Sequence, residues 1–183
     1  TGVQTCALPI CRLEPQKNQK LLIEAFALIS NKYNDYSLTI YGAGPLEGEL
    51  KQLSKVLGLQ EKINFPGFKP DIIHELLNSD LFVLTSDFEG MPNVLAEAMA
   101  VGLPCISTDC RGGGARALIQ NEVNGIIVPC NDKNGIANAM SRVIDDNTYA
   151  DKLARNARNI RHELLPDRIN KQWEDYLSLF DNK

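Results

Sequence analysis

Residues 87–102 read DFEGMPNVLAEAMAVG, and the rest of the chain can be interpreted outward from them. The preceding residues, 80–85, form a short apolar run that is typical of a buried strand. Pro92 lies where the first turn of a helix tolerates a residue without an N–H group. Residues 93–101 are then predicted to form a helix, with Gly102 just beyond its end. The stretch therefore predicts a strand, a loop and a helix in succession.

The start of this helix is predicted to be an anion site. Unpaired amides and the helix dipole both favour negative charge at a helix N-terminus. Two carboxylates bracket the site, Glu89 in the loop and Glu97 on the helix. Carboxylates repel phosphate but accept hydrogen bonds from sugar hydroxyls. We therefore expect a pocket for a phosphate flanked by polyols, although each glutamate taken alone could be a solvated surface residue.

Composition excludes several classes of protein. The chain has 183 residues, 44% of them hydrophobic, and a net charge of −4, so it lacks the basic footprint of a nucleic-acid-binding protein. No apolar run reaches about 18 residues, and the start does not resemble a signal peptide. The five cysteines form an odd set without Cys-x-x-Cys pairs, which favours reduced thiols in a cytoplasmic protein over a disulfide framework or zinc site.

Short apolar segments alternate with amphipathic ones along most of the chain. Among these segments we predict a helix after an N-cap at Asn18, a strand at residues 36–41, a Gly-rich loop at residues 108–117 and a helix at residues 148–164. This alternation predicts an α/β fold, a mostly parallel sheet covered by helices on both faces. In such sheets ligands bind beyond the carboxyl ends of the strands. Five loops, residues 12–17, 42–45, 66–69, 89–93 and 112–114, each follow a predicted strand or precede a predicted helix. We expect all five to meet at one edge and to form a single site.

Gly42-Ala-Gly44 between a strand and a helix could indicate dinucleotide binding. The third glycine, Gly48, comes one position late, and no acidic residue follows the next strand to bind a ribose. A tight turn is the better interpretation. The Gly-Lys-Ser/Thr sequence of a phosphate-binding P-loop is absent, and the two histidines, His74 and His162, lack nearby metal-ligand partners. We expect no metal site and no nicotinamide or flavin cofactor.

The first eleven residues differ from the rest of the chain. Residues 1–10, TGVQTCALPI, show no clean alternation, and Pro9 interrupts what should be a buried strand. The stretch also resembles adapter-derived read-through. We therefore expect residues 1–11 to be an artefactual tail and residues 12–183 to be the domain.

Taken together, residues 12–180 resemble the C-terminal half of a family-4 retaining glycosyltransferase (glycosyl transferases group 1). The most specific match is Glu89-x7-Glu97 within FEGMPNVLAEAMAVGLPCIST. RLEPQKN (residues 12–18), GAGP (42–45), the Gly67 loop and RGGGARALI (111–119) follow the family's order, with Ala115 where proline is common and Cys11 where glycine is usual. The resemblance implies a Rossmann-like domain of the two-domain GT-B architecture.

The resemblance also implies roles for individual residues. It assigns catalysis to Glu89 and donor binding to Arg12, Lys17, Phe68, Lys69, Gly90, Met91, Asn93, Val94, Leu95 and Glu97. The two cations would neutralise the donor diphosphate, together with the amides of residues 91–95. Glu97 would bind the ribose, and Glu89, with Gly90 and Met91, the transferred sugar.

The loop at residues 68–69 would pack on the base of the nucleotide, and transfer would need no metal and no cofactor. The implied activity is transfer of a sugar from a UDP-sugar, with retention, to a glycan or lipid-linked acceptor during surface polysaccharide synthesis in the cytoplasm or at the inner face of the membrane. An N-terminal acceptor domain would be missing, so this chain would bind donor but transfer little. The last helix, residues 167–181 with Trp173, would normally cross to that domain, and its apolar face would be exposed here. A UDP-sugar epimerase of the same fold and a non-catalytic nucleotide-sugar-binding remnant remain alternatives.

Overall fold

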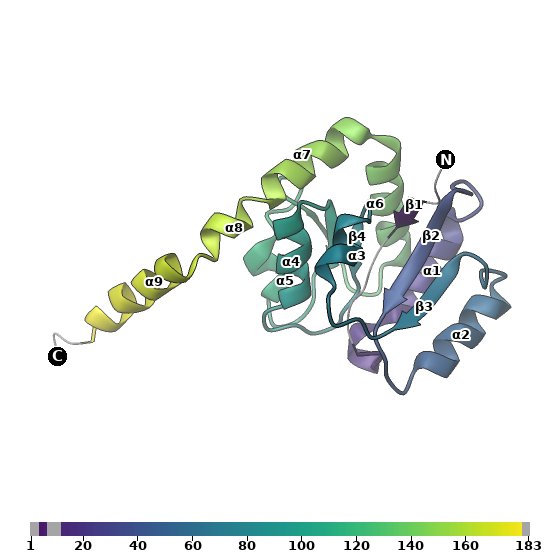
Figure 1. The fold of residues 1–183 in the computed structure, drawn as a ribbon, viewed down its shortest axis with the longest axis horizontal. Coiled ribbons are helices and arrows are strands. Elements are labelled where there is room, and N and C mark those ends of the chain that lie inside the picture. The colour runs from purple at the N-terminus through teal and green to yellow at the C-terminus, as the bar shows by residue number, and fades with distance from the viewer. Residues whose placement is uncertain (1–3, 7–11, 181–183) are drawn as a thin grey trace.

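The computed structural model describes residues 4–6 and 12–180, and its strands and helices alternate along the chain (Figure 1). The strands are β1 (Gln4–Cys6), β2 (Tyr36–Tyr41), β3 (Ile63–Gly67), β4 (Phe82–Leu84), β5 (Cys105–Thr108) and β6 (Ile126–Val128). The helices are the 3-10 turn η1 (Pro15–Lys17) and α1 (Gln19–Ile29), α2 (Glu47–Val56), α3 (Ile73–Leu77), α4 (Asn93–Val101), α5 (Gly114–Leu118), α6 (Lys133–Asp145), α7 (Asn147–Ala157), α8 (Ile160–Glu163) and α9 (Pro166–Ser178).

Among residues 4–6 and 12–180 every strand pairing is parallel, as expected for this alternation, and the pairings form two three-stranded sheets. β1, β2 and β3 make one three-stranded sheet, and β4, β5 and β6 make the other. The described part of β1 pairs with residues 36–38, the first half of β2.

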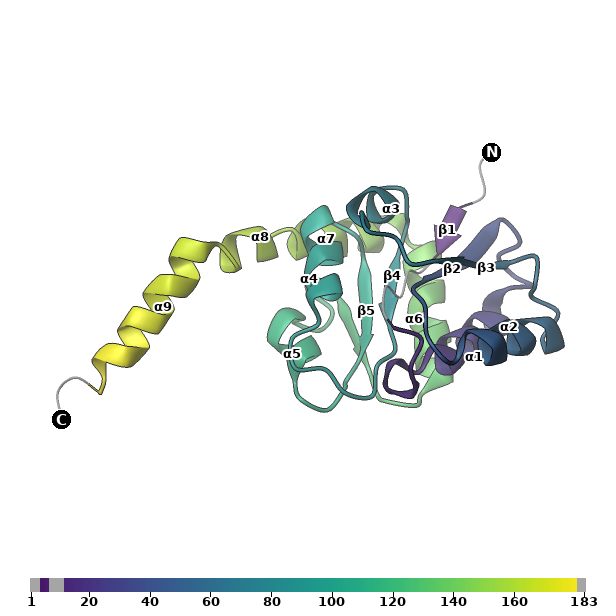
Figure 2. The same ribbon diagram turned by 60° about the horizontal axis from the view of Figure 1, so that its bottom comes forward.

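The alternation of side chains along β4 separates two layers of core. Leu81 and Val83 pack into a cluster with α1 and α6, whereas Phe82 and Leu84 pack into a second cluster with α3 and α4. Figure 2 accordingly shows α4 and α6 on opposite sides of β4 and β5. The first cluster also contains Leu38 of β2, so a single core supports both sheets. All three residues of β4 are buried, which explains why this strand is apolar throughout.

The structure revises three predicted segments. β1 lies within the stretch expected to be a tail, although Pro9 and most of that stretch fall outside the described residues. The helix predicted at residues 148–164 is interrupted, because α7 ends at Ala157 and α8 begins at Ile160. The Gly-rich loop predicted at residues 108–117 contains the first turn of α5. The domain boundary at residues 11/12 stays a prediction.

The last helix, α9, extends away from the body of the domain (Figures 1 and 2). It contains no buried residue, and Trp173 is 60% exposed. Trp173, Tyr176 and Phe180 form a row of edge-to-face contacts along one side. The prediction of an exposed apolar face is confirmed. No helix within residues 4–6 and 12–180 is long and apolar enough to cross a membrane.

Removing α9 should therefore leave the stability of the domain unchanged. A chain ending at Leu164 keeps all the buried side chains of both cores, so its free energy of unfolding should equal that of the full chain within about 0.5 kcal/mol. Urea unfolding measures this difference. Sedimentation velocity should show less self-association in the shortened chain, because its exposed aromatic row is gone. A loss of more than about 1 kcal/mol would contradict the exposed position of α9.

Candidate functional site

The five loops expected to meet at one edge are joined there by hydrogen bonds. Each loop bonds to its neighbour, although the loops come from distant parts of the sequence. The bonds are Gly42 N to Gly67 O (2.9 Å), Leu13 N to Ala43 O (3.1 Å), Gln16 Nε2 to Phe88 O (2.7 Å) and Gly114 N to Glu89 O (3.3 Å). The predicted convergence is confirmed, because the carboxyl ends of parallel strands share one edge.

A cavity of about 440 Å³ opens in the middle of this edge. It lies between the 12–17 loop on one side and the start of α4 on the other. Its lining residues are Arg12, Gln16, Lys17, Glu89, Met91, Pro92, Asn93, Val94 and Glu97. Most of the predicted site residues are therefore brought together around one space.

Glu89 is the most buried ionisable group of the cavity, with 7% of its surface exposed. Its Oε1 atom lies 2.6 Å from Lys17 Nζ and accepts a hydrogen bond from Ser86 Oγ, also at 2.6 Å. Lys17 and Glu89 are 72 positions apart in the sequence. Their ion pair places a cation and a carboxylate side by side at the base of the cavity.

The backbone of Lys17 is held by the end of β4. Thr85 Oγ1 lies 3.0 Å from the carbonyl oxygens of both Lys17 and Asn18. Asn18 adopts a left-handed conformation (φ 47°), which asparagine tolerates better than most residues. Its side chain accepts from Leu21 N at the start of α1 and donates to Asp87 Oδ1 at 3.2 Å. The N-cap predicted at Asn18 is confirmed, and it also fixes the loop that carries Lys17.

α4 begins at the residue predicted, but Pro92 is its N-cap rather than its first residue. The amides of Leu95 and Ala96 both donate to the Pro92 carbonyl. Leu95 is fully buried in the core, so it supports the start of the helix and does not line the cavity. Asn93 and Val94, whose amides precede the first intrahelical donors, line the cavity.

The Gly-rich loop closes against the loop of Glu89. A Cβ atom on Gly112 would collide with the Glu89 carbonyl, and one on Gly114 with the Gly90 carbonyl. Gly112 also has a φ of +93°, which L-residues rarely adopt. These glycines allow the two backbones to touch, and Gly90 itself lies in this contact rather than in the cavity lining.

The other cations differ in how firmly they are held. Arg12 lines the cavity with 82% of its side chain exposed, and its contact with Glu14 is 3.8 Å long.

Phe68 is 74% exposed in the loop after β3 and, like Lys69, does not line the cavity. Lys69 lies 3.8 Å from Glu75. The role of residues 68 and 69 in binding a base stays a prediction.

Glu75 also accepts a 2.5 Å hydrogen bond from the Tyr41 hydroxyl at the end of β2. Burial, and then this hydrogen bond, raise the pKa of Tyr41, so the hydroxyl remains a donor across the ordinary pH range. The contact ties α3 to the end of β2.

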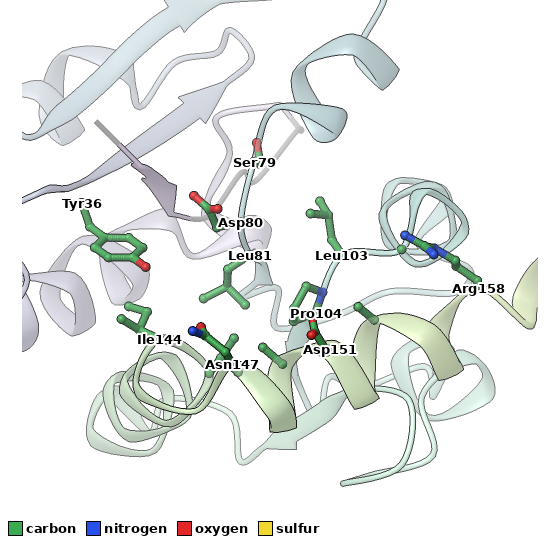
Figure 3. Close-up of a pocket in the computed structure, with 14 residues that line it drawn as sticks. Tyr36, Ser79, Asp80, Leu81, Leu103, Pro104, Ile144, Asn147, Asp151 and Arg158 are labelled. Carbon is green, nitrogen blue, oxygen red and sulfur yellow. The ribbon is translucent and has the colours of Figure 1, made fainter. Parts of the chain in front are cut away.

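Another cavity, of about 500 Å³, lies at the opposite edge, where β2, β4 and β5 begin (Figure 3). Tyr36, Asp80 and Pro104 come from that edge, Asn147 and Asp151 come from α7, and Arg158 directly follows α7. None of the predicted site residues lines it. In the part of the chain that the structure describes, no group of three or more His, Cys, Asp or Glu side chains is arranged to hold a metal ion.

The sequence did not predict two polar contacts of the site. One is the hydrogen bond from Ser86 to Glu89, and the other is the hydrogen bond from the Gln16 side chain to the Phe88 carbonyl. Ser86 lies three positions before Glu89, and nothing in the hydrophobic pattern distinguishes it from any serine at the end of a strand. Its spacing to Glu89 was the only available signal.

Comparison with known proteins places these features in a family. The family model described as "Glycosyl transferases group 1" matches residues 4–160. The chain is 33% identical over 177 residues to the UDP-Gal:alpha-D-GlcNAc-diphosphoundecaprenol alpha-1,3-galactosyltransferase of Escherichia coli. That match covers 94% of this chain and 45% of the Escherichia coli protein. The chain thus spans less than half the length of this relative.

Solved structures show the same fold. HepE of Anabaena in complex with UDP superimposes with a TM-score of 0.86 at 28% identity, over 95% of this chain and 48% of HepE. The C-terminal domain of LpcC, a glycosyl transferase group 1 family protein of Francisella tularensis, gives a TM-score of 0.80 at 26% identity. That comparison covers 89% of this chain and 86% of the LpcC domain. These similarities support the Rossmann-like α/β assignment and the GT-B fold.

Proposed function

Because this chain belongs to the glycosyl transferases group 1 family, we propose that it is the donor-binding domain of a retaining, metal-independent, family-4 glycosyltransferase. The donor is a UDP-sugar, and the acceptor is a glycan or a lipid-linked glycan in the cytoplasmic synthesis of a surface polysaccharide. Acceptor binding belongs to a second domain of the GT-B architecture, so this chain alone binds donor and transfers little. The UDP in the HepE structure and the UDP-Gal and diphosphoundecaprenol in the name of the Escherichia coli relative support this choice.

The observation that carries the proposal is the charge pattern of the cavity. Lys17, Asn93 and Val94 line the same cavity, and the Lys17 ammonium group and the two amides at the start of α4 are donors suited to a diphosphate. Glu89 and Glu97 line it too, and their carboxylates are acceptors suited to hydroxyl groups. Both kinds of group in one cavity match a ligand in which a diphosphate joins a ribose to a sugar.

The same arrangement accounts for the chemistry expected of a glycosyltransferase. Negative charge develops on the diphosphate as the bond to the sugar breaks, and donors held in advance stabilise such charge most effectively. Lys17 has three N–H donors, of which one is used by Glu89. The other two, with the helix amides, can stabilise the leaving group without a metal.

Glu97→Ala should weaken UDP binding by about 10-fold or more, because a carboxylate that accepts hydrogen bonds from the ribose contributes about 1.5–3 kcal/mol. Isothermal titration calorimetry with UDP measures the loss. Glu49→Ala is the matched control, since Glu49 is also exposed on a helix but lies on α2, away from the cavity. Equal affinity in Glu97→Ala and the original chain would exclude the ribose role.

Chelation should leave donor binding unchanged. Adding EDTA at a large excess is expected to alter the Kd for UDP by less than about 2-fold, because Lys17 and amides supply the positive charge. The same titration with and without added Mg²⁺ completes the test. A strict requirement for a divalent ion would rule out the proposed metal-independent site.

A further inference from the structure

Ser86 supports Glu89 from the interior of the domain. It lies two residues beyond the end of β4 and is fully buried, at 0% exposure. Its carbonyl accepts a 2.5 Å hydrogen bond from Thr108 Oγ1 at the end of β5, and its hydroxyl donates to Glu89 Oε1 at 2.6 Å. The serine is thus anchored to the neighbouring strand before it touches the carboxylate.

The two oxygens of the Glu89 carboxylate are in different situations. Oε1 receives both donors, Lys17 Nζ and Ser86 Oγ, which saturates its two lone-pair positions. No residue that the structure describes donates a hydrogen bond to Oε2. Buried polar atoms without a partner form a separate group, and Oε2 does not belong to it. Oε2 is therefore accessible, and Glu89 lines the cavity. One oxygen serves the protein, and the other is left for a ligand.

We propose that Ser86 is a positioning residue for the sugar of the donor. It would fix the Glu89 side chain so that Oε2 points to a hydroxyl of the transferred sugar. The inference rests on the proposed function, and it separates recognition of the sugar from recognition of the nucleotide. Ser86 does not line the cavity, so it acts only through Glu89.

Lys17 alone is poorly suited to hold Glu89 during binding. Its long side chain has several rotatable bonds, and a diphosphate entering the cavity competes with Glu89 for the ammonium group. A serine hydroxyl rotates about one bond, and Ser86 is held in the core by the bond from Thr108. The orientation of Glu89 can therefore persist while Lys17 shares its ammonium group with phosphate.

The test compares two ligands on four proteins. Calorimetry gives Kd for UDP and for UDP-glucose, UDP-galactose and UDP-N-acetylglucosamine, and the tightest of the three UDP-sugars is kept. The quantity of interest is the ratio of the UDP Kd to the UDP-sugar Kd. Ser86→Ala should lower this ratio about 3- to 10-fold, the value of one hydrogen bond, and change the UDP Kd by less than about 2-fold. Ser86→Thr, which keeps a hydroxyl, should restore most of the ratio.

Ser107→Ala is the matched control. Ser107 is equally buried, lies on β5 and donates to the Thr108 carbonyl rather than to Glu89, so its loss should leave the ratio unchanged. Circular dichroism verifies folding. If Ser86→Ala does not fold, Ser86→Cys keeps the volume with only a weak donor and should show the same fall.

The outcomes separate the two proposals. An unchanged ratio in Ser86→Ala, or an equal fall in Ser107→Ala, overturns the positioning role and leaves nucleotide binding intact. If Ser86→Ala weakens UDP binding and UDP-sugar binding equally, Ser86 contributes only to general stability, and the positioning role is again overturned. If the original chain binds neither UDP nor any UDP-sugar, the proposed function fails and the inference fails with it.

Discussion

Gly114→Ala is expected to lower the free energy of unfolding by about 2–3 kcal/mol, because overpacking a close contact costs about this much. Gly114 is buried at the start of α5. A Cβ atom there would collide with the carbonyl oxygen of Gly90 and would lie 2.8 Å from Cδ of Pro92. Both neighbours are backbone or ring atoms, which cannot rotate away as a flexible side chain can.

The same substitution should weaken UDP binding by more than about 10-fold, because shifts of about 1 Å in a site cost factors of this order or greater. To admit the methyl group, Gly90 and Pro92 must move. Pro92 is the N-cap of α4, and Gly90 directly follows Glu89. The displacement would therefore reach both the helix amides and the carboxylate. Chemical denaturation and calorimetry measure the two effects on one protein sample.

Gly48→Ala is the control for Gly114→Ala. Gly48 lies on α2, and an added Cβ would meet no atom within 4 Å. An alanine in a helix is more stable than glycine by about 0.5–1 kcal/mol, so this variant should be neutral or slightly more stable. Wild-type stability in Gly114→Ala would show that α5 and the Glu89 loop are not in tight contact.

Local patterns predicted much of the fold because strong signals bounded the elements. α4 was predicted to the residue, since Pro92 and Gly102 mark its two ends, and β2 was predicted to the residue as a strand closed by Gly42. The convergence of loops followed from parallel topology alone. The break between α7 and α8 was missed because no proline or glycine marks it.

The site was harder to predict in detail because its contacts join distant segments. The signature suggested that Lys17 and Glu89 share a site, but not that they form an ion pair with Ser86 on the same oxygen. That arrangement depends on rotamers and on where β4 ends, which a periodic pattern does not encode. Leu95 was assigned to the site through its backbone amide, and in the structure this amide donates to the Pro92 carbonyl within the first turn of α4.

Lys17→Met is expected to reduce UDP affinity about 10- to 100-fold, because a charged hydrogen bond to phosphate contributes about 1.5–3 kcal/mol. Lys17 is the better held of the two cations in the cavity: its side chain is 22% exposed, against 82% for Arg12. Less ordering entropy is then lost when phosphate binds. Lys20→Met is the matched control, since it removes the same charge from an exposed position on α1 outside this cavity.

Lys17→Met should also destabilise the domain by about 1–3 kcal/mol, because it leaves a largely buried carboxylate without its cation. Adding Glu89→Gln to that variant tests the cause. If the lone charge is responsible, the double variant should recover stability, because an amide costs less to bury than a carboxylate, but it should not recover UDP affinity. Urea unfolding and calorimetry are carried out on the original chain, Lys17→Met, Glu89→Gln and the double variant. Together they separate the role of Lys17 in stability from its role in UDP binding. Recovery of both properties would show that Lys17 serves only to neutralise Glu89, and the diphosphate would then have to be bound by Arg12 and the α4 amides alone.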